Sequence, residues 1–77
     1  MLRLEGEING RKVVRDCDTA ESVAWTAAVL LDVCAIHEVR LGMILRSLYS
    51  AALDGQTWRW SAMEFALTLH GQPDGRG

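Results

Sequence analysis

Polar and apolar residues alternate over residues 2–17, and this pattern predicts a β-hairpin that turns at Asn9-Gly10. Asn-Gly is the strongest short signal for a two-residue hairpin turn, because a type I′ turn requires positive φ at both central residues. A turn at this point pairs Ile8 with Arg11, and every later pair follows in step out to Leu2 and Cys17.

This register separates the two faces of the hairpin. One face is mostly apolar and holds Leu2, Leu4, Ile8, Val13 and Cys17, with Arg11 and Arg15 among them. The other face pairs opposite charges across the strands, which supports a sheet. These pairs are Glu7 with Lys12 and Arg3 with Asp16. The register assumed from the turn therefore produces one face suited to burial and one suited to water.

The next segment predicts a helix over about residues 19–34. Asp18 and Glu21 match a capping box, with Asp18 at the N-cap. Apolar side chains project from nearly all sides of this helix, which is typical of a buried helix. Trp25, Val29, Val33 and Ile36 lie on the arc opposite the main apolar stripe. We therefore expect a partner subunit or a third helix to cover that second face.

A second helix is predicted over about residues 37–53, and Asp54-Gly55 is a suitable stop signal. No glycine or proline separates it from the first helix. A single helix of this combined length would greatly exceed the usual length of about 11–12 residues, so we expect a kink or short turn near 33–37.

The C-terminal part allows two interpretations. Ser61 and Glu64 match a second capping box, which favours a third helix over 62–70. Alternation of Phe65, Leu67 and Leu69 favours a strand instead. The helix is the preferred interpretation, with a disordered tail over 71–77. The predicted fold is thus α+β, a hairpin packed on two to three helices in the order ββααα, within a single domain spanning 1–70.

Composition restricts the possible functions. The chain has 77 residues, a net charge of -2 and a 49% hydrophobic fraction, typical of a small globular protein. The longest apolar stretch is too short for a membrane span, and the N-terminus has no signal-peptide core, so a cytoplasmic location with free cysteines is expected. The sequence has no stripe of basic residues of the kind that nucleic-acid-binding proteins carry.

No motif for catalysis or metal binding is complete. His37-Glu38 begins the zinc-protease pattern H-E-x-x-H, but Leu41 occupies the position of the second histidine. Cys34 and His37 lie one helical turn apart, whereas Cys17 and His70 have no closely spaced partner ligands. No nucleophile elbow or glycine-rich phosphate loop is present. We therefore expect no cofactor, no metal and no enzymatic activity.

The sequence leads to the hypothesis of a non-enzymatic protein–protein interaction module. Such a module would be a small regulator or inhibitor that binds another protein, self-associates, or both. A phage- or mobile-element-encoded inhibitor of a host system, of the anti-CRISPR type, fits this profile. The alternative is a nucleic-acid-binding regulator that uses the basic hairpin. An unpaired hairpin edge also allows pairing with a partner strand. Candidate partner-binding residues are Arg11, Arg15, Trp25, Trp58 and Arg59.

Overall fold

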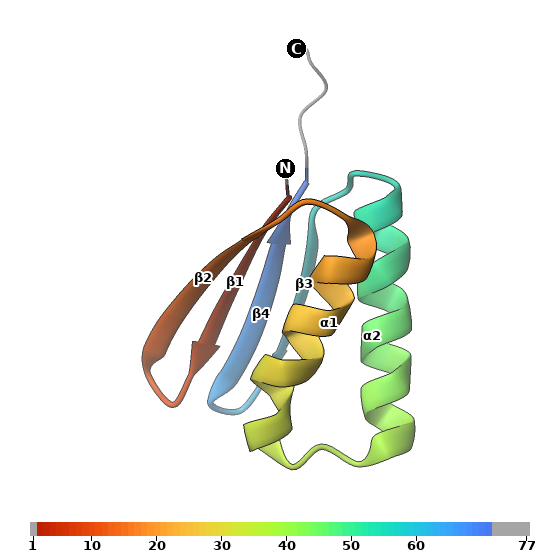
Figure 1. The fold of residues 1–77 in the computed structure, drawn as a ribbon. Helices are drawn as coiled ribbons and strands as arrows, with labels where there is room; N and C mark the ends of the chain where they lie inside the picture. The colour runs from red at the N-terminus through yellow and green to blue at the C-terminus, as the bar shows by residue number, and fades with distance from the viewer. Residues whose placement is uncertain (1, 72–77) are drawn as a thin grey trace.

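A computed structural model describes residues 2–71 and shows one antiparallel four-stranded sheet with two helices on one face (Figure 1). The strands lie in the order β2-β1-β4-β3. The elements along the chain are β1 (Leu2–Ile8), β2 (Arg11–Cys17), α1 (Ala20–Leu31), the 3₁₀ helix η1 (Asp32–Cys34), α2 (Glu38–Leu53), β3 (Trp58–Ala62) and β4 (Phe65–His70).

The N-terminal hairpin has the predicted register. Asn9 and Gly10 both have positive φ, 54° and 83°, as the type I′ turn requires. Ile8 pairs with Arg11, and the pairing continues in step to Leu2 and Cys17. The hairpin prediction is therefore confirmed residue by residue, because all of its information lies in one short segment.

The helical region is close to the prediction but differs at its start. Thr19 is the N-cap of α1 and its side chain accepts a hydrogen bond from the Ser22 backbone N–H, so the predicted Asp18 cap is wrong by one residue. The expected break is confirmed, with Ala35 in the left-handed region at φ 52° between η1 and α2. Helix α2 ends at Leu53 with Asp54 as its C-cap, followed by Gly55 at φ 68°.

The predicted third helix over 62–70 is wrong, and so is the order ββααα. The structure has two antiparallel strands, β3 and β4, and the order ββααββ. Four residues of capping-box sequence favour a helix only locally. The alternation of Phe65, Leu67 and Leu69 instead fits the pleat of β1, which pairs Leu4 with Leu69. The α+β class remains correct, because one sheet and two helices make up the described chain.

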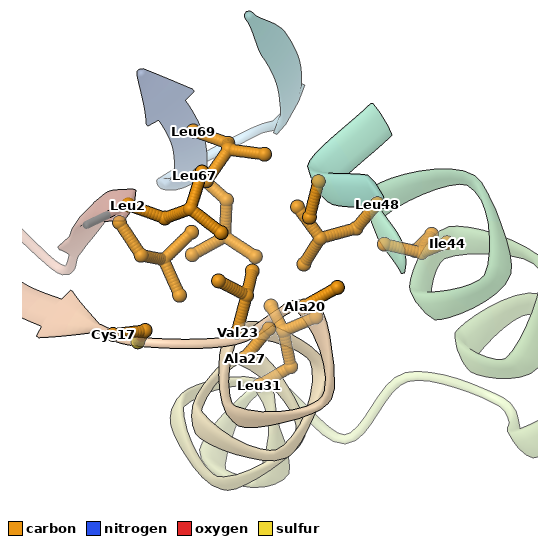
Figure 2. Close-up of a cluster of buried hydrophobic side chains, with 12 residues drawn as sticks. Leu2, Cys17, Ala20, Val23, Ala27, Leu31, Ile44, Leu48, Leu67 and Leu69 are labelled. Carbon is orange, nitrogen blue, oxygen red and sulfur yellow. The ribbon is translucent and has the colours of Figure 1, made fainter. Parts of the chain in front are cut away.

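The core lies between the sheet and the helices (Figure 2). Side chains from β1 and β4 point toward those of α1 and α2. The largest fully buried side chains are Leu4, Leu31, Leu48, Leu67, Leu69 and Val23. Gly6 on β1 allows close packing, because a Cβ there would lie 3.3 Å from Leu67 Cδ2 and 3.6 Å from Leu30 Cδ1.

The residue that follows β4 is hydrogen-bonded to the connection between α2 and β3. The Gly71 backbone N–H donates a hydrogen bond to Thr57 Oγ1 at 3.2 Å. The expectation of a disordered tail falls, apart from Gly71, on residues 72–77, which lie outside the described residues. Neither α1 nor α2, the helices of the described range 2–71, has the length and apolar character to cross a bilayer.

Candidate functional site

The outer face of α1 carries the most exposed aromatic side chain of the helix layer. The core-facing stripe of α1 is Ala20, Val23, Ala27 and Leu31. Trp25 and Val29 lie about half a turn away from that stripe, on the side that faces water. Trp25 is 71% exposed and Val29 is 55% exposed. The sequence predicted a partner subunit or a third helix as the cover of this side. Residues 2–71 form no third α-helix, so these side chains lie open in the described chain.

Four residues of this face border a shallow, open hollow. Trp25, Ala28, Val29 and Asp32 line it, and its volume is about 260 Å³. We call these four residues the α1 patch. Because indole is large, rigid and both apolar and hydrogen-bonding, an exposed Trp beside an aliphatic residue is typical of a binding hot spot.

The charged residues on α1 and on the chain segments directly before and after it are acidic. No Lys or Arg occurs between Asp16 and Arg40. The same stretch carries the acidic residues Asp18, Glu21, Asp32 and Glu38, all exposed. The α1 patch itself contains one carboxylate, Asp32, and Glu21 lies about one turn from Trp25. These two carboxylates favour basic groups on a partner, whereas Arg11 and Arg15 lie on the helix-facing side of the neighbouring strand β2.

Trp58 and Arg59, which the sequence places side by side, point to opposite faces of the sheet. Trp58 is half-buried, packs against the core and donates a hydrogen bond from Nε1 to Ser47 Oγ at 3.0 Å. This contact ties β3 to α2, so Trp58 has a structural role. Arg59 is exposed on the face away from the helices, where it pairs across the strands with Thr68. The structure therefore does not combine them into one site.

Arg11 and Arg15 lie on the helix-facing side of β2, as the register predicted, opposite Ile8 and Leu4. Both are exposed, because β2 is an edge strand of the sheet. Arg15 Nη1 donates to the backbone carbonyl of Val14 at 3.0 Å. The edge position explains how two charged residues occur on the apolar side of the hairpin: this side is open to water at the sheet margin.

The uncovered face of the sheet is a charged surface with its own pairs. Arg3 Nε lies 3.3 Å from Asp16 Oδ1, and His70 Nε2 lies 3.3 Å from Glu5 Oε1. The hydrogen bond from His70, which outweighs the opposing effect of burial, lowers the pKa of Glu5 below its ordinary value of 4.5, with smaller contributions from Lys12 and Arg3. The basic residues of this face are thus largely balanced by carboxylates, which weakens the nucleic-acid hypothesis.

The groups with potential reactivity are scattered. His37 Nδ1 accepts a hydrogen bond from the Val39 N–H, and His70 is engaged with Glu5. Cys17 and Cys34 are free thiols, and burial raises the pKa of Cys34, which reduces its thiolate fraction. Within residues 2–71 no three His, Cys, Asp or Glu side chains come together as metal ligands. Over the same range no polar or charged residue is fully buried.

Sequence reasoning proposed Trp25, which is exposed, as a partner-binding residue, but it did not anticipate the Glu5–His70 pair. That pair depends on β1 lying next to β4, the first and last strands along the described chain. The alternation of residues 65–69 was the available signal for it. Comparisons of the chain with protein-family models, with curated proteins and with solved structures found no match.

Proposed function

We propose that this chain is a non-enzymatic protein–protein interaction module that binds a partner protein through the α1 patch. The observation that carries the proposal is the exposure of Trp25, 71%, next to Val29 and Asp32 around one hollow. Burying a Trp side chain removes about 150–250 Å² of surface from water. Because Trp25 is exposed in the free chain, a partner that covers it gains this burial on binding.

The partner is a protein surface with an apolar side chain that fills the hollow and Lys or Arg residues around it. Asp32 lies at the hollow itself, and Glu21 precedes Trp25 by four residues, or about one helical turn. Binding without catalysis suits this chain, because His37 and His70 are both engaged in contacts within the protein. The free thiols are also at least partly buried, Cys17 fully and Cys34 in part. In that role the module acts as a regulator or inhibitor by covering a surface of its partner.

A photoreactive amino acid in place of the exposed Glu21, about one helical turn from Trp25, tests the proposal in the cells of origin and leaves Trp25 in place. The crosslinked protein is then purified and titrated against the unlabelled module by calorimetry. We expect Trp25→Ser to weaken binding about 30-fold or more, because hot-spot tryptophans contribute at least about 2 kcal/mol. Binding is also expected to weaken with added salt, because salt screens ion pairs that Asp32 and Glu21 form with the partner.

The matched control is Met43→Ser on α2, since Met43 is 68% exposed but lies on the other helix. This variant should bind like the unmodified chain. The proposal is wrong if no purified protein binds saturably, or if Trp25→Ser and Met43→Ser weaken binding equally.

A further inference from the structure

A second surface, independent of the α1 patch, is the free edge of β2. The sheet order β2-β1-β4-β3 leaves β2 with a neighbour on one side only. Ile8 and Arg11 flank the two-residue turn and form the closing pair, which exchanges both backbone hydrogen bonds. Hydrogen-bonded pairs then recur at every second residue. The backbone groups of Lys12, Val14 and Asp16 therefore point away from β1, toward the open edge.

The side chains of these same three residues lie on the uncovered face of the sheet, because Val14 is opposite Glu5 and Lys12 is opposite Glu7. They are exposed, and Val14 is one of the large apolar residues left open to water. The edge thus reads Lys, Val, Asp at its three outward hydrogen-bonding positions. This order is positive, neutral, negative along the strand. The Val14 carbonyl accepts a hydrogen bond from the exposed Arg15 side chain at 3.0 Å, a contact that an added strand replaces.

We infer that a second copy of this chain pairs with the first along β2, antiparallel, with Val14 opposite Val14 on a two-fold axis. This register places Lys12 of each copy opposite Asp16 of the other. Both ion pairs lie on the same face and flank the central Val14 contact. All three positions have outward backbone groups, so the pairs exchange N–H···O=C hydrogen bonds. The result is one continuous eight-stranded sheet.

Charge complementarity selects this register over its neighbours. Centring the axis on Val13 places Arg11 opposite Arg15, and centring it on Arg15 places two Arg15 side chains opposite each other. Axes on Lys12 or Asp16 oppose identical charges as well. Only the Val14 axis has no like charges directly opposite and two attractive pairs. A register shift of one residue places residues with outward backbone N–H and C=O groups opposite residues whose backbone groups point to β1. Strands in that register form no ladder of hydrogen bonds.

The opposite edge, β3, does not offer the same match. Arg59 and Ser61 hold its outward backbone positions, by the hydrogen-bonded closing pair of Ala62 and Phe65. Self-pairing centred on Arg59 opposes two guanidinium groups. A two-fold contact through β2 also closes on itself, so it limits assembly at this edge to two copies. Charged residues on an edge strand usually prevent pairing with other strands. Here the order of the charges along β2 allows pairing with the same strand of a second copy.

A mixing experiment tests the register. Lys12→Asp and Asp16→Lys each create two like-charge pairs in their own dimer, and each should weaken self-association about tenfold or more. Mixed in equal amounts, the two variants should form a heterodimer, because the new carboxylate at position 12 faces the new ammonium at position 16. Sedimentation equilibrium of each variant and of the mixture measures this. Circular dichroism confirms that both fold.

Val14→Pro provides a second, independent test. The Val14 N–H points outward, so proline removes no bond to β1 and blocks only the added strand. We expect it to abolish dimers, whereas the matched variant Ser61→Pro, on the β3 edge, should leave them intact. A wild-type chain that stays monomeric at millimolar concentration overturns the inference. So does a dimer that survives Val14→Pro, or a mixture that stays monomeric. None of these results affects binding at the α1 patch.

Discussion

Met63 is the residue at which a single substitution distinguishes the observed hairpin from a helix. It is the first residue of the two-residue turn between Ala62 and Phe65, with φ at 54°, and it is fully exposed. In type II′ turns, which have positive φ at this position, glycine is the usual occupant. Met63→Gly should therefore stabilise the protein.

The size of the effect follows from the backbone alone, because an exposed Met63 side chain has no packing to lose. A left-handed backbone costs a non-glycine residue about 1–2 kcal/mol. Glycine in turn makes the unfolded chain more flexible, which costs about 0.4–1 kcal/mol. The balance is a net stabilisation of about 1 kcal/mol, or a rise in Tm of about 4–8 °C for a domain of this size.

The assay is thermal and urea unfolding followed by circular dichroism and tryptophan fluorescence. Met43→Gly is the matched control, because Met43 is also exposed but lies inside α2. Glycine in a helix interior costs about 1 kcal/mol, so this variant should be destabilised. If residues 62–70 formed a helix, both substitutions would lower stability. A loss of stability in Met63→Gly would therefore refute the hairpin and the reasoning from it.

Three further outcomes test the packing. Leu4→Ala, at a fully buried position in β1, should lower the free energy of unfolding by about 2–5 kcal/mol in urea titrations. A double-mutant cycle of Trp58→Phe and Ser47→Ala, which removes the bond between β3 and α2, should give a coupling energy of about 0.5–1.5 kcal/mol, and additive effects would contradict that bond. The pKa of Glu5 is lowered in the folded state, so its contribution to stability is present above pH 4.5 and is lost as the pH falls through the folded-state pKa. The stability difference between the wild type and Glu5→Gln should shrink accordingly in unfolding curves recorded from pH 7 to pH 3, while a constant difference would contradict the His70 contact.

Two candidate binding residues show what the local sequence can predict about a site and what depends on tertiary contacts. Trp25 was predicted as a partner-binding residue, and it is exposed because no later element within residues 2–71 covers the outer side of α1. Trp58 was predicted as well, but Ser47 accepts its hydrogen bond and the core contacts its ring. Nothing near Trp58 in the sequence indicates Ser47, since their proximity depends on how β3 lies against α2.

The sequence alone determined the β1–β2 hairpin down to its register, the approximate spans of both helices and the break between them. These features depend on the turn at Asn9-Gly10, on periodicity and on stop signals within a few residues, all of which act over short distances. The tertiary structure decided the state of residues 58–70, where a local capping signal competed with alternation. The strand form prevails because β4 pairs with β1 on one side and β3 on the other. That pairing satisfies backbone hydrogen bonds and buries Leu67 and Leu69, contributions that no window of adjacent residues contains.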